Sequence, residues 1–252
     1  MHILVLVIVS FDKPVYYDML QVWRERVCSR SDVWFIQCKP ASEWIGDVIN
    51  DILDTSLKDR FELDIANKTL FIRGDECLIP GILHKTVEAL SFFLHHSTLL
   101  EPSFNSMSKA EYDEFPLFVW RTNLSSVLDF AGLQRYLGTI NSSGFYGGYI
   151  GLGSLNNGSS TFFASGAGFL MSRDVAKYLV LNKQFLRWDL IDDVAIGALL
   201  EPKFSIVPIE RCWVQSGEEV VGSDGVFHYR CESYQHLRTV EFMQYVVRGL
   251  SK

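Results

Sequence analysis

Two segments of the chain carry residue types that chemistry on a polar substrate requires. The first is the small-residue run Ser165-Gly166-Ala167-Gly168, and the second is the acidic pair Asp192-Asp193 at the start of an apolar stretch. Small residues let a backbone approach a ligand closely, so we expect a turn before a helix at the first segment. Neighbouring carboxylates can ionise at different pH values, which is how a general base is made. Together the two segments predict a transferase site for a polyhydroxylated substrate.

The elements that must position these segments alternate between strands and helices. Apolar runs predict strands at residues 2–10, 33–38, 69–72, 116–120 and 204–208. Helical spacing of apolar residues, with Pro14 and Pro80 in first turns, predicts helices at residues 14–27, 80–94, 133–137, 173–182, 192–200 and 237–247. Residues 144–165 should form a strand, a loop and a strand on the ligand side, and residues 97–114 a loop. Because no repeat or linker interrupts the pattern, residues 1–252 are expected to form one α/β domain.

Composition excludes several classes of partner. The formal net charge is -7 and no basic run occurs, which argues against a nucleic-acid partner. The five cysteines are scattered without a Cys-x-x-Cys pair, so we expect reduced thiols in a cytosol-like compartment and no zinc cage. Cys212 and Cys231 are the pair to check for a bridge.

The apolar N-terminal run indicates a buried strand. It ends at Ser10, whereas a membrane span needs about 20 apolar residues. A secretory signal would need a basic start and a small-residue cleavage site, and neither is present. A soluble, cytoplasmic protein without a membrane anchor is therefore expected.

Five blocks, in order and at similar spacing over about half of the chain, resemble the fringe and β-1,3-galactosyltransferase family of glycosyltransferases. Residues 118–125 resemble its strand ending in Lys-x-Asp-Asp-Asp-Val, and residues 75–86 resemble its Asp-x-Tyr-x-Asn-Leu-Thr-x-Lys-Thr helix start. Its Ser-Gly-Gly-Gly-Tyr block, its Glu-Asp-Val-x-x-Gly block and its late Phe-His pair resemble residues 165–174, 192–197 and 227–228. The resemblance implies a single GT-A (Rossmann-like) domain, with a mixed, mainly parallel central sheet flanked by helices.

The resemblance also implies an activity. The family moves a sugar from a nucleotide-diphosphate donor, here expected to be a UDP-sugar, to a hydroxyl of a glycan acceptor. Inversion requires a carboxylate that takes the acceptor proton, and the family's base aligns with Asp193. Capping of the following helix is the structural alternative for Asp192 and Asp193, and a retaining enzyme would need no base. Golgi members carry a membrane helix, so a bacterial or viral enzyme acting in the cytoplasm fits this chain better.

One departure from the family concerns the metal. Its Asp-x-Asp is replaced by Asn123-Leu124-Ser125, and no Asp-x-Asp occurs anywhere in the chain. Carboxylates normally hold the Mn²⁺ or Mg²⁺ that neutralises the diphosphate, and an amide and a hydroxyl are poorer ligands. Either a cation binds weakly at Asn123 and Ser125 with His228, or Arg121, Lys85 and backbone N–H groups meet the diphosphate. A third possibility is a noncatalytic nucleotide-sugar or glycan-binding module. A strand end followed by a helix cap would also explain the segment.

The remaining candidate contacts follow from strand ends and small residues. Ser10 and Phe11 end the first strand, and ligands of open α/β sheets lie at the carboxyl ends of strands, so both should border the nucleotide base. Tyr146 beside Gly147 offers an aromatic face for stacking on a sugar, with core packing as the alternative. The substrate contacts expected beside Tyr146 and Gly147 are Ser165, Gly166, Gly168 and Asp192.

Overall fold

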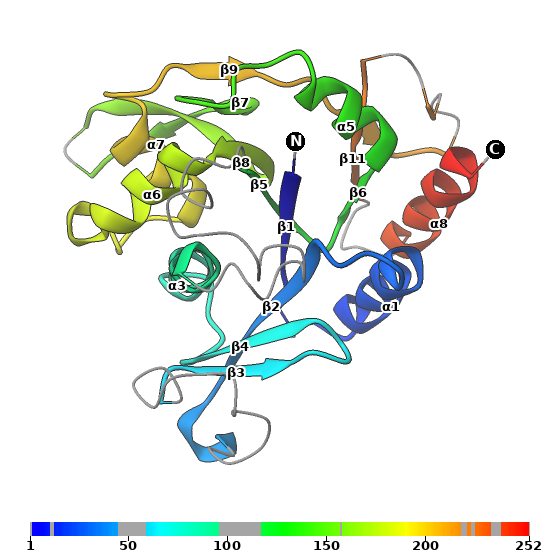
Figure 1. Ribbon diagram of the computed structural model, residues 1–252, viewed down its shortest axis with the longest axis horizontal. Helices are drawn as coiled ribbons and strands as arrows, with labels where there is room; N and C mark the ends of the chain where they lie inside the picture. Colours follow the sequence, from blue (N-terminus) through cyan, green and yellow to red (C-terminus); the bar gives the residue numbers. More distant parts are fainter. Residues whose placement is uncertain are drawn as a thin grey trace, which may run out of the picture.

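The chain folds into alternating strands and helices (Figure 1). The computed structural model describes residues 2–10, 13–44, 59–95, 117–156, 158–217, 221–222, 225–232 and 238–251. The first half contains β1 (His2–Ile8), α1 (Val15–Val27), β2 (Val33–Lys39), η1 (Ala41–Glu43), β3 (Phe61–Asp64), β4 (Thr69–Arg73), α3 (Gly81–His95), β5 (Leu117–Asn123) and β6 (Ser126–Leu128). The second half contains α5 (Phe130–Leu137), β7 (Tyr146–Ser154), β8 (Ser160–Ser172), α6 (Arg173–Leu181), η4 (Lys183–Phe185), α7 (Asp192–Leu200), β9 (Ile206–Pro208), β10 (Cys212–Val214), β11 (His228–Cys231) and α8 (Thr239–Leu250).

Eight strands form one large mixed sheet in the order β3-β4-β2-β1-β5-β8-β7-β9. Strands β4, β2, β1 and β5 are mutually parallel, and β9 is parallel to β7. Strand β8 runs antiparallel to both of its neighbours, and β3 runs antiparallel to β4. The chain is therefore an α/β protein with a mixed sheet, an arrangement compatible with a Rossmann-like fold.

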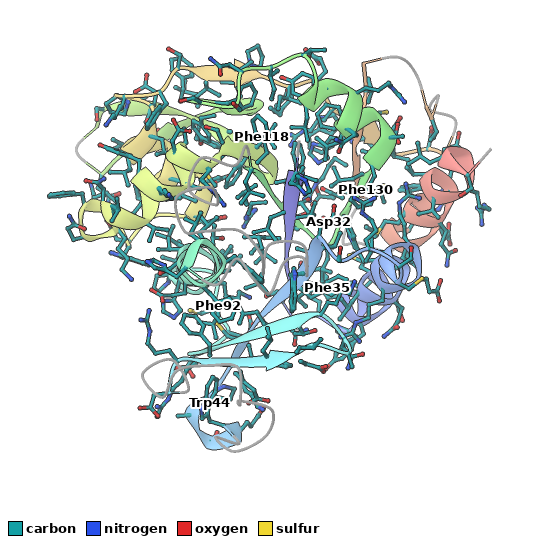
Figure 2. All side chains as sticks on the ribbon, in the orientation of Figure 1. Asp32, Phe35, Trp44, Phe92, Phe118 and Phe130 are labelled. Carbon is teal, nitrogen blue, oxygen red and sulfur yellow. The ribbon has the colours of Figure 1, made fainter. Side chains whose placement is uncertain are left out.

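Both faces of the sheet are covered, which explains why its central strands are apolar throughout. Along β1, Leu4, Leu6 and Ile8 pack into the core with α3, α6 and α7, whereas the alternate residues pack into the core with α1, α5 and α8. Figure 1 shows these two groups of helices on opposite sides of the central strands. Phe92 and Phe118, both labelled in Figure 2, belong to the first and second core respectively.

A small second sheet, with the order β10-β11-β6, continues from the end of β5. Strand β6 begins three residues after β5 ends and pairs antiparallel with β11, so that Arg230 lies opposite Ser126. The N–H of Cys231 donates to the carbonyl of Ser125 at 2.8 Å. This pairing brings the C-terminal part of the chain to the tip of β5.

The expected turn at Ser165–Gly168 is wrong, because these residues lie inside β8. The first part of β8, residues 160–164, pairs with residues 150–154 of β7. Its last part pairs with β5 on one side and with residues 146–148 of β7 on the other. The β7–β8 register shifts between Gly148 and Ile150. The small residues accommodate this irregularity in an extended strand, so a turn-like composition here marks a bulge.

Most other predicted elements are confirmed with small changes in their ends. Strands β3, β6, β10 and β11 were not expected, and the strand predicted at 204–208 is the shorter β9. The loop predicted at 97–114, the start of the 116–120 strand at Pro116 and the start of the last helix at Leu237 lie outside the described residues. None of the helices in the described ranges combines the length and apolar character needed to cross a membrane.

Cys212 and Cys231 lie on adjacent strands but do not form the bridge considered above. The Sγ of Cys212 contacts the Trp213 carbonyl at 3.8 Å, and that of Cys231 contacts the Tyr229 carbonyl at 4.0 Å.

Candidate functional site

A cavity of about 530 Å³ lies where β1 and β5 end, between the middle of β8 and the start of α7. This position, at the carboxyl ends of parallel strands, is where open α/β sheets bind ligands, and the volume suits a small-molecule site. Its lining residues are Ile8, Ser10, Tyr16, Glu76, Cys77, Leu78, Ile82, Arg121, Asn123, Leu124, Ser125, Ser165, Gly166, Ala167, Ile191, Asp192, Asp193, Trp213, Arg230 and Glu232. The structure thus brings Ser10, Arg121, Asn123, Ser125, Ser165, Gly166, Asp192 and Asp193 together, as the sequence analysis expected of site residues.

The two acids that begin α7 have different partners. Asp192 is buried and its Oδ2 accepts from Nη2 of the buried Arg121 at 2.5 Å. Among the residues that the structure describes, Asp193 accepts from main-chain N–H groups: Gly166 donates to Oδ2 at 2.8 Å and Val194 donates to Oδ1 at 2.9 Å. Arg121 also donates to the Gly166 carbonyl. Its guanidinium, expected at the diphosphate, therefore holds Asp192 and β8 in place.

The electrostatic environment favours the protonated form of Asp193. Burial raises the pKa of its carboxyl group, and the negative charge of Asp192 raises it further. The Gly166 N–H, the positive charge of Arg121 and the Val194 N–H oppose this shift without cancelling it. A carboxylate whose pKa is raised is a stronger base than an ordinary aspartate, which is the property that general-base catalysis uses.

The side chains of Arg121 and Asp193 approach the backbone closely at Gly166. A Cβ atom there would lie 3.0 Å from Nη1 of Arg121 and 3.3 Å from Oδ2 of Asp193. Gly168 has a different role, since its Cβ would lie 2.6 Å from the Trp120 ring and 2.9 Å from Nε2 of His228. Gly166 therefore belongs to the cavity, whereas Gly168 is a packing glycine that does not line it.

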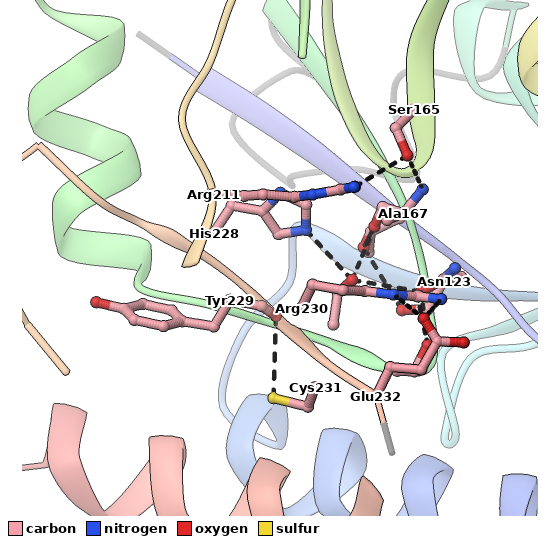
Figure 3. Close-up of polar contacts among 12 residues, drawn as sticks. Asn123, Ser165, Ala167, Arg211, His228, Tyr229, Arg230, Cys231 and Glu232 are labelled. Carbon is pink, nitrogen blue, oxygen red and sulfur yellow. Dashed lines mark hydrogen bonds and ion pairs between the residues drawn. The ribbon is translucent and has the colours of Figure 1, made fainter. Parts of the chain in front are cut away.

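At the tip of β5, the guanidinium of Arg230 is bound to the segment Asn123–Ser125, which aligns with the family's Asp-x-Asp. Nη1 of Arg230 donates to Oδ1 of Asn123 at 2.7 Å and to Oγ of Ser125 at 2.5 Å (Figure 3). Its Nε and Nη2 both donate to Oε2 of Glu232, at 3.1 and 2.9 Å. The two oxygens proposed as metal ligands thus already face a positive charge. Two neutral oxygens that already accept from a guanidinium are a poor site for a divalent cation, whose sites usually include at least one carboxylate.

His228 lies in the core behind this tip and does not line the cavity. It is 1% exposed, packs edge-on against Trp120 and has Nε2 3.2 Å from Oγ of Ser126. Burial lowers its pKa to about 3, and the charges of Arg211 and Arg230 contribute to the shift. This is the position of a neutral packing residue, which corrects its expected role as a ligand.

Lys85 is likewise buried away from the cavity. Its Nζ donates to the Val9 carbonyl and to Oε2 of Glu76, both at 2.6 Å. Glu76 also accepts from Oγ of Ser10 at 3.3 Å and from the Cys38 N–H at 3.0 Å. Lys85 therefore positions Glu76, which lines the cavity, and cannot itself reach a diphosphate there. Phe11 lies outside the described residues.

The expectation that Tyr146 stacks on a sugar is wrong because its ring is fully buried. Its hydroxyl accepts from the Ala164 N–H at 3.1 Å, and burial raises its pKa above the ordinary value. A Cβ at Gly147 would lie 2.8 Å from the Val207 carbonyl, so this glycine allows β9 to pair. The aromatic side chains that do line the cavity are those of Tyr16 and Trp213.

Sequence reasoning missed several lining residues, among them Glu76, Trp213, Arg230 and Glu232. Glu76 adjoins Asp75 in one of the matched blocks. Arg230 shares a strand face with His228, because side chains alternate along β11. The signals were present, but only the pairing of β11 with β6 aims Arg230 at Asn123.

Comparisons of the sequence with protein-family models and with curated proteins give no match. The class that fold and site define is therefore an α/β protein with a charged cavity at the carboxyl ends of its parallel strands.

Proposed function

We propose that the chain is a GT-A glycosyltransferase that moves a sugar from a nucleotide-diphosphate donor, most simply a UDP-sugar, to a glycan hydroxyl with inversion. The observation that carries the proposal is Asp193: a carboxylate with a raised pKa that lines a cavity at the carboxyl ends of parallel strands. The resemblance over five sequence blocks supports the same assignment, since it aligns the family's base with this residue.

In the proposed reaction, Asp193 takes the proton of the acceptor hydroxyl. The acceptor oxygen then forms a bond to the anomeric carbon, and the bond from that carbon to the diphosphate oxygen breaks on the opposite face. The nucleoside diphosphate leaves with the electron pair. Main-chain N–H groups of Gly166 and Val194 fix the orientation of Asp193 and leave lone pairs of its oxygens for the acceptor.

The pairing of Asp192 with Arg121 supports a division of roles between the two acids. Asp192 is committed to a buried ion pair, and its charge contributes to the raised pKa of Asp193. Two carboxyl groups held in different environments are a common way to separate a structural acid from a base.

The test is Asp193→Asn, with Asp189→Asn as the matched control. Asp189 is an exposed carboxylate paired with Arg187 shortly before α7, and it does not line the cavity. We expect Asp193→Asn to bind UDP as the wild type does and to lose transfer by about 10²- to 10⁴-fold, the usual contribution of a general base. Asp189→Asn should keep both properties. UDP binding is measured by calorimetry, and transfer is measured as UDP release from a panel of UDP-sugars.

Near-wild-type UDP release by Asp193→Asn would remove the base from the proposal. A retained anomeric configuration in the product, read by NMR, would point to a retaining enzyme. The neutral pair Asn123 and Ser125 in place of metal-binding carboxylates favours a second candidate, a noncatalytic nucleotide-sugar or glycan-binding module. That module would bind UDP or a UDP-sugar and release no UDP from any donor.

A further inference from the structure

The cationic side chain at the tip of β5 bears on how a diphosphate is held. Arg230 reaches the cavity from β11, its side chain is 13% exposed, and Asn123 and Ser125 orient its Nη1. Both of these partners are neutral. They fix the direction of the guanidinium and leave its charge in place.

From this arrangement we infer that Arg230 binds the diphosphate of the donor and supplies the positive charge for which related enzymes use a metal ion, so that donor binding needs no divalent cation. The inference rests on the proposed function and adds to it the residue that receives the donor and the independence from metal.

Two other cations close to the cavity, Arg121 and Lys85, have partners that leave them unsuited to this role. Arg121 is buried, pairs with Asp192 and donates to the Gly166 carbonyl. Lys85 has no exposed surface and is bound by Glu76 and the Val9 carbonyl. Among the described lining residues, Arg230 is therefore the cation best placed for an incoming anion.

The Nε and Nη2 edge of Arg230 is the one that a phosphate would take. Two parallel N–H groups form the fork with which arginine binds phosphate oxygens. In the structure Glu232 occupies this edge with one oxygen, and its side chain is 37% exposed. A carboxylate that is partly in solvent can exchange with a diphosphate, which carries more negative charge. We therefore assign Glu232 as the group that the donor displaces.

The same contacts disfavour a metal ion at this tip. A divalent cation would need the oxygens of Asn123 and Ser125, which already accept from Nη1 of Arg230. Cation and guanidinium would repel each other at such a distance, and no carboxylate stands at positions 123 and 125 to compensate. Neutral residues at positions 123 and 125 are thus compatible with Arg230 at this tip, where a bound divalent cation would not be.

The experiment measures the affinity for UDP, GDP and CDP by calorimetry, in EDTA and in millimolar Mn²⁺, for wild type and three variants. Wild type should bind at least one nucleotide, and its affinity should be the same in the two buffers, because a metal ion that takes no part in binding does not change the equilibrium. Arg230→Gln should weaken binding by about 10- to 100-fold, the value of hydrogen bonds to a charged group. Glu232→Gln should tighten it by about two- to fivefold, because a competing carboxylate is removed. Arg187→Gln, which removes an exposed arginine outside the cavity, is the control and should not change it.

Two outcomes would overturn the inference and leave the proposed function standing: nucleotide binding by wild type that EDTA abolishes, or wild-type affinity in Arg230→Gln. If Arg230→Gln unfolds, as thermal melting would reveal, Glu232→Gln decides, because an Arg230 with a purely structural role predicts unchanged or weaker binding in that variant. Absence of nucleotide binding in both buffers, together with absence of UDP release from UDP-sugars, would refute the proposed function as well.

Discussion

Because His228 is buried and neutral, we expect the free energy of unfolding to fall on mild acidification, and we expect His228→Gln to remove this part of the pH dependence. Burial, together with the charges of Arg211 and Arg230, holds its pKa at about 3 in the folded protein. An unfolded chain exposes the imidazole, whose ordinary pKa is about 6.5. Between these two values the unfolded state binds a proton that the folded state does not, so stability rises with pH in this window and falls as pH falls.

The magnitude follows from the two pKa values. At pH 5 the unfolded histidine is almost fully protonated, which stabilises the unfolded state by about 2 kcal/mol relative to pH 8. The folded state at pH 5 is still well above its own pKa and gains nothing. His228→Gln should be less stable than wild type at pH 8, because it loses packing against Trp120, but it should lose about 2 kcal/mol less than wild type between pH 8 and pH 5.

Urea unfolding of both proteins at the two pH values measures this difference. Other titrating groups, including Asp193 with its raised pKa, contribute to both proteins and cancel in the comparison. Ser126→Ala is the control: it removes the hydroxyl next to Nε2, should cost about 1 kcal/mol, and should keep the wild-type dependence on pH. Equal losses in His228→Gln and wild type would refute the assignment of a neutral His228.

Two further substitutions test the parts that hold the cavity together. Glu76→Gln leaves the buried ammonium of Lys85 without a charged partner and should destabilise by about 3 kcal/mol, the low end for broken buried pairs because Glu76 is a quarter exposed. Glu241→Gln, in an exposed pair with Arg238, should cost less than about 0.5 kcal/mol in the same urea unfolding assay, and similar values for the two variants would contradict the argument. Gly166→Ala places a Cβ 3.0 Å from Nη1 of Arg121 and 3.3 Å from Oδ2 of Asp193, so these groups must shift slightly and UDP release should fall by about fivefold through misplacement of the base. Unchanged release in Gly166→Ala would mean that these groups move apart freely.

The sequence predicted those parts of the site that depend on neighbouring residues within one segment of the chain. Asp192 and Asp193 stand next to each other at the start of a helix, and β1 and β5 are apolar runs that end in polar residues. A parallel sheet gathers such strand ends at one edge, so these residues could be placed together before the structure was known. Their partners could not be predicted, because Arg121 and the Asp192 that it binds are 71 residues apart in the sequence.

The errors arose where one residue type serves two purposes. Glycines 166 and 168 look alike in sequence, yet the first makes room for charged groups and the second for Trp120 and His228. Tyr146 beside two glycines suggested a sugar platform, but its strand runs between β8 and β9 and leaves its ring in the core. In each case the distinction depends on which neighbour the sheet brings alongside, and that information is not local.

The charges around the cavity explain why Asp193 differs from the other acids there. Glu76 pairs with Lys85, Asp192 with Arg121 and Glu232 with Arg230. Within the described lining, Asp193 is the acid that accepts from main-chain N–H groups and forms no ion pair with a cation. On the proposed function, a diphosphate that displaces Glu232 would add negative charge to the cavity and raise the pKa of Asp193 further. Donor binding would thus strengthen the base before the acceptor arrives, which couples the two halves of the site through charge alone.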